Sequence, residues 1–426
     1  MLPKFNQTTC FVNEILTFYF PKTCRNPMTP FLGLLIILII AFVGTRFFGR
    51  VVPRENPFLS GLVVSGIPYI LIGVLLGPHF FNFLSNDIID SLESLISLAL
   101  GWIGLLFGLQ LRWHNIRRFP RNYMLFSSLQ SLISFLIILS LMGGVFLFLH
   151  TGHFQDRAVA VIILAALGSI SAPASIAKII MEYKAKGRLS HFLQFVSSLD
   201  SFWGIVIAGV AMAIFHPPAT HWFSSSWHWL LLSLAISVGL GFLFRFLIQL
   251  HFEPEELLLL VLGLVIFTSG IGFYLQLSPI FLTMVVGITL AQFPRESEKV
   301  MRVISVAEKP IYLFLLIFAG ALWNYRFWEE ILLVLAFITI RYLAKYAGGF
   351  ISARNINCAF HIPQNVGKSL LSFGGVSLAI AFNFQLFYGG AVGDLLMSAT
   401  ILGVFLFDEY TAFATLKILR REGEIQ

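Results

Sequence analysis

The feature that most constrains this chain is a series of long apolar runs. Runs of about 18 or more residues with few charges recur from Pro30 onward, and each is long enough to cross about 30 Å of hydrocarbon. Charged residues make up only 12% of the 426 residues, whereas a soluble domain carries about 25%. Because lipid offers no partners for free backbone groups, runs of this kind must form helices. The sequence therefore predicts an all-α polytopic membrane protein.

Run lengths and helix breakers divide the chain into about 13 transmembrane helices. The expected spans are Pro30–Phe48, Leu59–Leu76, Ile88–Leu109, Leu125–Leu149, Arg157–Tyr183, Ser190–Phe215, Trp227–Leu250, Glu255–Gln276, Pro279–Phe293, Ala307–Trp323, Phe327–Ala353, Ser369–Phe384 and Asp394–Leu419. The first run has no small-residue cleavage site behind it, so we expect a retained span rather than a signal peptide. This division leaves residues 1–29 as an N-terminal segment, 30–419 as the transmembrane domain and 420–426 as a tail.

Lysines and arginines gather in every second loop. The basic loops and the tail hold Arg50 and Arg54; Arg112, Arg117, Arg118 and Arg121; Lys184, Lys186 and Arg188; Arg295, Lys299, Arg302 and Lys309; Arg354 and Lys368; and Lys417, Arg420 and Arg421. The loops between them hold one basic residue or none. Since short basic loops remain in the cytoplasm, we expect a cytoplasmic C-terminus, an exported N-terminal segment and residence in the cell (inner) membrane. Topology explains the net charge of +7, and no nucleic-acid partner is expected.

Cysteine and histidine usage gives little sign of redox or metal chemistry. Cys10 and Cys24 fall in the exported segment, where they form a disulfide if the compartment is oxidising; two unpaired thiols fit the sequence as well. The 10 histidines lack the spacing of metal ligands. No phosphate-binding loop or nucleophile motif stands out. We therefore expect no enzyme activity, no cofactor and no metal beyond a transported monovalent cation.

Asp200 is the most informative single residue. It is the only acidic residue in the apolar stretch Ser190–His216, and Arg341 and Lys345 lie at comparable depth in the stretch Phe327–Ala353. A charge near the bilayer centre costs about 2.5–3.5 kcal/mol even on lenient scales. A chain keeps such a group when it is paired, or when it handles ions or protons. The sequence therefore predicts an ion-handling carboxylate at Asp200, paired with Lys345 or with Arg341.

Helix-breaking residues interrupt two of the expected spans. The fifth span contains Gly168, Ser169, Ser171, Ala172, Pro173 and Ser175 in mid-segment, and the twelfth contains Ser372, Gly374, Gly375 and Ser377. Proline and glycine also mark ordinary kinks in membrane helices. Two interrupted helices at corresponding positions of two halves, however, indicate a transporter's ion site near the midplane.

Six segments, in this order, resemble the monovalent cation/proton antiporter superfamily, especially bacterial members of its second branch. They are IPYILIGVLLGP (Ile67–Pro78), LGWIGLLFGLQLRW (Leu100–Trp113), SAPASIAKIIMEYKAKG (Ser171–Gly187), SLDSFWG around Asp200, RYLAKYAGG (Arg341–Gly349) and LLSFGGVSLAIAF (Leu370–Phe382). The resemblance implies two inverted repeats, with spans four to six facing spans eleven to thirteen and the two broken helices crossing. It also implies a core domain that moves against a dimerisation domain by alternating access, in a homodimer.

The same resemblance implies a site with one departure from the family. With Gly204 as anchor, Asp200 takes the first position of the family's acidic pair and Ser201 the second, where a carboxylate normally binds the cation. A one-residue slip would restore Asp200 to that second position, but it needs a gap inside a helix. The implied ion- and proton-binding residues are Asp200, Ser201, Lys345 and Ser171. The implied supporting residues are Arg341, Pro173, Gly374, Gly375 and Ser377.

The expected function is secondary-active exchange of sodium or potassium for protons. A serine hydroxyl coordinates a cation but does not exchange a proton near neutral pH, so coupling would fall on Asp200 and Lys345, one proton for one cation. Two alternatives stay open. One is a transporter of the same fold with another solute or altered coupling, because of Ser201. The other is a non-transporting scaffold or sensor, against which the retained Asp200 and Lys345 argue.

Overall fold

The computed structural model describes residues 66–425 apart from 113–118, 150–153, 217–225, 251–252, 324–326 and 359, together with Gly33, Leu35 and Ile39. Within these residues every regular element is helical. The elements are α4 (Ile67–Leu76), α5 (Asn86–Ser91), α6 (Glu93–Gln110), α8 (Arg121–Leu149), α9 (Phe154–Ser169), α10 (Pro173–Glu182), α11 (Arg188–Ile214), α12 (Ser226–Gln249), α13 (Pro254–Tyr274), α14 (Pro279–Ala291), α15 (Pro294–Leu322), α16 (Phe327–Asn355), the 3₁₀ helix η1 (Val366–Leu370), α17 (Gly374–Tyr388) and α18 (Gly390–Arg421). The all-α prediction is confirmed.

Nine helical stretches of the described chain are long and apolar enough to cross a membrane, and three further apolar helices are shorter. Most expected spans agree with these helices within a few residues. The expected N-terminal segment 1–29, with Cys10 and Cys24, lies outside the described residues. Of the expected span Pro30–Phe48, only Gly33, Leu35 and Ile39 are described.

Two of the expected spans differ from the structure, one by an interruption and one by its first residue. The span Ile88–Leu109 is interrupted at Leu92, where α5 ends and α6 begins. The tenth span begins at Pro294 rather than Ala307, so the basic group expected in a loop lies on a helix. Its first turns are amphipathic: Val300 and Ile304 are buried, whereas the basic side chains are exposed. A search for unbroken apolar runs misses a helix start of this kind.

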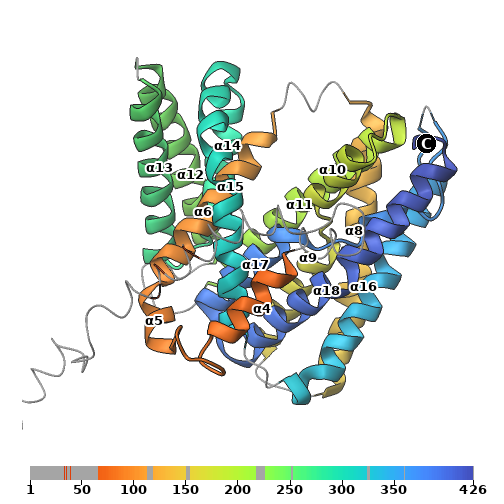
Figure 1. The fold of residues 1–426 in the computed structure, drawn as a ribbon, viewed down its shortest axis with the longest axis horizontal. Coiled ribbons are helices and arrows are strands. Elements are labelled where there is room, and N and C mark those ends of the chain that lie inside the picture. Colours follow the sequence, from red (N-terminus) through yellow and green to blue (C-terminus); the bar gives the residue numbers. More distant parts are fainter. Residues whose placement is uncertain are drawn as a thin grey trace, which may run out of the picture.

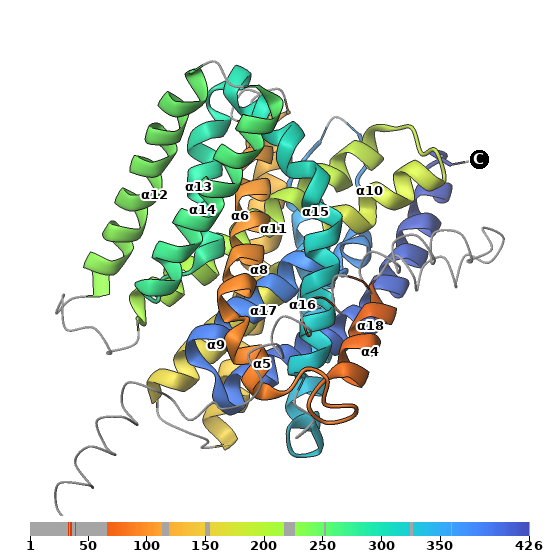
Figure 2. The same cartoon turned by 60° about the vertical axis from the view of Figure 1, so that its left-hand side comes forward.

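The helices form two packed groups (Figures 1 and 2). Helices α12, α13 and α14 lie to one side, with α6 and α15 next to them, and a shared apolar cluster joins these five helices. One buried residue from each shows the cluster: Trp102, Leu240, Val261, Val286 and Val300. The second group contains α8–α11 and α16–α18. Each half of it has a long helix, an interrupted helix and another long helix, and α8 packs against α16. This is the arrangement expected for two inverted repeats.

The interrupted helices meet where each leaves the helical path. The first break is residues 170–172, between α9 and α10, and the second is residues 371–373, between η1 and α17. The backbone N–H of Ala172 donates to the carbonyl of Ser372 across a distance of 3.1 Å. Pro173 begins α10, where a missing N–H costs nothing. Gly374 begins α17 with φ +62°, a conformation that glycine adopts readily. Both predicted breaks are confirmed.

The C-terminal tail folds back onto the start of α11. The Glu424 carboxylate accepts hydrogen bonds from the backbone N–H groups of Leu189 and Ser190, at 2.8 and 2.9 Å, and from the Ser190 hydroxyl at 2.5 Å. The Lys186 N–H donates to the Glu424 carbonyl at 3.2 Å. Glu424 therefore supplies the N-terminal cap of the helix that carries Asp200.

Candidate functional site

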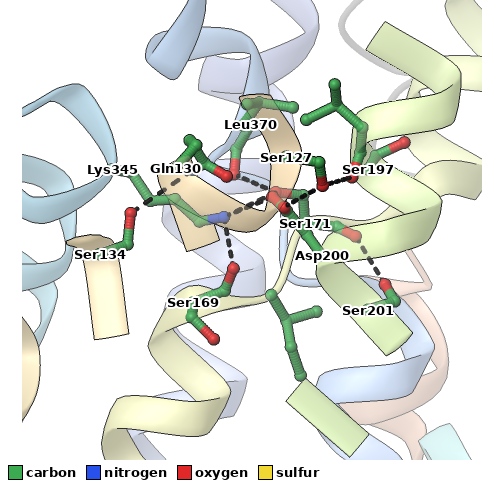
Figure 3. Close-up of polar contacts among 12 residues, drawn as sticks. Ser127, Gln130, Ser134, Ser169, Ser171, Ser197, Asp200, Ser201, Lys345 and Leu370 are labelled. Carbon is green, nitrogen blue, oxygen red and sulfur yellow. Dashed lines mark hydrogen bonds and ion pairs between the residues drawn. The ribbon is translucent and has the colours of Figure 1, made fainter. Parts of the chain in front are cut away.

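Asp200 and Lys345 form an ion pair at the crossing. Asp200 lies in the middle of α11 and Lys345 in the middle of α16, and both side chains are 0% exposed. The distance from Lys345 Nζ to Asp200 Oδ2 is 2.9 Å (Figure 3). The choice of partner that the sequence leaves open is thereby resolved, since Lys345 rather than Arg341 pairs with Asp200. Burial of both charges favours the pair over either charge alone.

Serine residues complete the surroundings of this pair. The Ser171 hydroxyl, in the first break, lies 2.6 Å from Asp200 Oδ2, and Lys345 Nζ donates to the same hydroxyl at 2.8 Å. Lys345 Nζ also donates to the Ser169 carbonyl at 2.5 Å. On the other side, the Ser127 hydroxyl of α8 donates to Asp200 Oδ1 at 3.1 Å. Both carboxylate oxygens and the ammonium group are thus hydrogen-bonded (Figure 3).

Ser201 belongs to the same cluster but points elsewhere. Its hydroxyl donates to the Ser171 carbonyl at 2.8 Å, and its side chain has no exposed surface. Its hydroxyl therefore does not bind the Asp200 carboxylate and instead joins α11 to the first break. No charge from position 201 enters the site.

Arg341 holds the backbone ends of both breaks. Its Nη1 donates to the Leu371 carbonyl at 2.5 Å, and its Nη2 donates to the carbonyls of Ile170 and Ser372 at 3.0 and 3.5 Å. The guanidinium carbon lies 3.7 Å from the centre of the Phe373 ring. A cation at the carboxyl ends of helices offsets their partial negative charge. Arg341 therefore binds the backbone carbonyls of both breaks and does not pair with Asp200.

Of the other expected supporting residues, two lie at the crossing and two lie away from the ion pair. Pro173 and Gly374 begin the half-helices at the crossing. Gly375 and Ser377 do not contact the ion pair: Gly375 packs against the ring of Tyr312, and the Ser377 hydroxyl donates to the Phe373 carbonyl within α17. Ser377 therefore has a local helical role.

Two polar residues at the breaks, Ser127 and Asp408, were not among the expected site residues. Ser127 is one serine among several on α8, and only the packing of α8 against α11 reveals its contact with Asp200. Asp408 on α18 is buried and accepts the Phe373 N–H at 3.0 Å. A signal for Asp408 exists, because it is an acid inside the last apolar run. The neighbouring Glu409 makes that run look interfacial.

A cavity of about 250 Å³ lies beside the Asp200 segment of α11, between this helix, α6 and α14. Gln194, Leu199 and Phe202 line it from α11, and Gln110 and Met284 line it from the other helices. The residues of α11 that line the cavity share one face of the helix, and Asp200 lies on the opposite face, so the cavity does not reach the ion pair. Among the described residues no group of three or more His, Cys, Asp or Glu is placed to hold a resident metal.

Comparison with known proteins gives a family and a fold. Residues 62–415 match the transmembrane family of sodium/hydrogen exchangers. The fold is similar to that of the sodium proton antiporter MjNhaP1 from Methanocaldococcus jannaschii at pH 8, with a TM-score of 0.65, 16% identity, and coverage of 92% of this chain and 99% of that chain.

An electron-microscopy map of the same antiporter gives a TM-score of 0.62 at 15% identity, covering 93% of this chain and 98% of that chain. No curated protein sequence matches the chain. The family match spans well over half of the 426 residues. The chain therefore belongs to the sodium/hydrogen exchanger family of multi-pass cation/proton antiporters, which are transporters and not enzymes.

Proposed function

We propose that this protein exchanges a monovalent cation, sodium or potassium, for protons by alternating access, with Asp200 and Lys345 as the coupling pair. The observation that carries the proposal is the enclosed ion pair at the crossing of two interrupted helices, where Lys345 Nζ lies 2.9 Å from Asp200 Oδ2. A buried pair of this kind is costly unless it is well compensated. Membership of an antiporter family supports a transport role for it.

Exchange at the pair follows from competition for one carboxylate. A cation that reaches Asp200 replaces the Lys345 ammonium group as the partner of Oδ2. Lys345, left without its counter-charge in a dry site, releases its proton. Ser171 Oγ and the Ser169 carbonyl, which accept hydrogen bonds from Lys345 in this conformation, are oxygen ligands of the kind that such cations take. One proton leaves for each cation bound, so exchange is electroneutral.

Alternating access requires one group of helices to move against the other. The cavity lined by Gln194 and Phe202 lies at the boundary between α11 and the group that contains α6 and α14. We infer that this boundary is the sliding surface and that the cavity is part of the ion path. The group with α12–α14 would then hold the contact between two copies in a homodimer.

The orientation proposal rests on one face of the molecule. The first residues of α8, the loop before α11, the end of α16 and the C-terminal tail come together there, through an apolar cluster and hydrogen bonds. These segments hold basic residues such as Arg121, Arg188 and Arg354. By the positive-inside rule this face is cytoplasmic, and the protein resides in the cell (inner) membrane.

Purified protein in proteoliposomes tests the function. With an inward-acid pH gradient and a pH-sensitive dye inside, sodium, lithium and potassium are titrated at several pH values while current is recorded. We expect sodium or potassium to collapse the gradient without net current. Absence of any cation response would refute antiport. A robust current with several protons per cation would refute one-for-one coupling and favour the alternative of altered coupling.

A further inference from the structure

A second cavity, of about 300 Å³, lies between α6, α15 and the beginnings of α10 and α17, and Phe107 lines both cavities. Pro173 and Gly374, the first residues of the two half-helices, both line it. Exposed Glu308 and Lys309 on α15 lie at its rim, and Asp408 of α18 lines its interior. The cavity therefore has a mostly apolar lining and reaches the second break at Asp408, a buried carboxylate.

Asp408 has the capacity to bind another group. It is 8% exposed, and its Oδ1 accepts the Phe373 N–H at 3.0 Å. The Gly374 backbone also contributes a hydrogen bond. A carboxylate offers about four lone-pair sites, so two backbone donors leave room for a cation or a proton. No described lysine or arginine makes a direct ion pair with Asp408.

Asp200 offers no such capacity in this conformation. Its Oδ1 accepts from Ser127, its Oδ2 accepts from Ser171 and Lys345, and its side chain is 0% exposed. The neighbouring position holds Ser201, whose hydroxyl is committed to a backbone carbonyl. Of the two acids at the breaks, Asp408 is therefore the one that an ion in a cavity can reach.

We propose that Asp408 is a second cation- and proton-binding carboxylate, reached through this cavity, which takes the place of the carboxylate missing at Ser201. The proposal rests on the antiport function proposed above. A monovalent cation that binds Asp408 displaces one proton from the protonated carboxyl group, so the exchange stays one for one. Glu308 and Lys309 at the rim give the entrance both signs of charge, so selection for a cation falls to Asp408 inside.

The matched variants are Asp408→Asn and Glu409→Gln, assayed as full-length protein in proteoliposomes. Asparagine keeps an oxygen for the Phe373 N–H but has no charge. We expect the apparent KM for sodium or potassium to rise about tenfold or more, the size of a lost charge-assisted contact, with a smaller change in maximal rate. Glu409→Gln, one residue further along α18 and outside the cavity lining, acts on Asp408 only through its charge and should change the KM much less.

Unaltered protein provides a test that does not depend on the folding of a variant. A hydrophobic carbodiimide labels reachable protonated carboxyl groups, and mass spectrometry locates the label. We expect labelling at Asp408 that saturating sodium or potassium slows, labelling at Glu308 that the cation does not change, and none at Asp200.

Three results separate the two proposals. Cation-insensitive labelling of Asp408, or an unchanged KM in a folded Asp408→Asn variant, would overturn the role of Asp408 while antiport stands. Absence of cation-driven proton movement in the unaltered protein would refute antiport itself. A KM increase together with cation protection supports both.

Discussion

The two breaks share one backbone plan but hold their acids in different ways. At the first break Asp200 is enclosed by Lys345 and by serine hydroxyls from α8 and from the break itself. At the second break Asp408, on the helix in the corresponding position, is held by backbone N–H groups at the start of α17 and lines a cavity. The two repeats thus hold a fully buried ion pair, Asp200 with Lys345, at one break and a carboxylate that lines a cavity, Asp408, at the other.

Arg341 shows how the two breaks act as one unit. It lies one helical turn before Lys345 on α16 and donates to carbonyls at both breaks, Ile170 at the first and Leu371 at the second. Anionic Asp408 lies at an amino end of a helix and cationic Arg341 at carboxyl ends, which are the favourable arrangements. Arg341 therefore links the surroundings of both acids, in addition to the direct hydrogen bond between the backbones of Ala172 and Ser372.

The largest expected effect is that of Asp200→Asn. It leaves the Lys345 ammonium group buried without a counter-charge, and breaking a buried pair from one side costs about 3–5 kcal/mol. We expect a clear fall in the unfolding temperature and loss of cation-driven proton movement. The corresponding change at Asp408 should cost much less stability, because an amide oxygen still accepts the Phe373 N–H. Thermal unfolding in detergent and proteoliposome assays measure both.

The double variant Asp200→Asn with Lys345→Met separates stability from exchange. Methionine removes the uncompensated charge and keeps most of the side-chain volume, so we expect most of the lost stability to return and exchange to remain absent. Exchange by this double variant would show that the first break is not the coupling site and would shift the role to Asp408.

The sequence was sufficient for the parts of this comparison that depend on strong local signals. Long apolar runs predict the spans, Pro173 and Gly374 predict the breaks, and Asp200 stands out as an isolated acid. The partner of Asp200 was not predictable, because Arg341 and Lys345 lie on neighbouring turns of one helix and differ only in how they meet the crossing. Ser127 meets Asp200 only because α8 packs against α11. Asp408 is visible as an acid in an apolar run, but its contact with the second break depends on how α18 packs against α17, which no local pattern encodes.

A smaller effect is expected from Gly374→Ala at the second break. Gly374 has φ +62°, and an added Cβ would lie 2.5 Å from the Cβ of Ala172 in the first break. Backbone strain of this kind costs about 1–3 kcal/mol, and the crossing must also widen. We expect lower stability and slower exchange.

The matched control for this change is Gly144→Ala in α8. No atom lies within 4 Å of the added methyl group there, so we expect unchanged or slightly higher stability, since alanine is the better helix former by about 1 kcal/mol. Equal effects of the two substitutions would contradict a special conformation at the second break.

The smallest expected effect comes from the tail, which joins the helices of the two acids. Glu424 follows the end of α18, the helix of Asp408, and caps the start of α11, the helix of Asp200. Glu424→Ala removes that cap and should cost about 0.5–2 kcal/mol. Glu422→Ala, at an exposed position two residues earlier, is the control and should cost nothing measurable.

Exchange assays on the same two tail variants ask whether α11 and α18 must move together. If they move as one body, loss of the cap should slow exchange in step with the loss of stability, while the KM for the cation stays unchanged, because neither acid is touched. A raised KM in Glu424→Ala would mean that the tail sets the geometry at Asp200 or Asp408, and the contrast between the two breaks would then depend on the C-terminus.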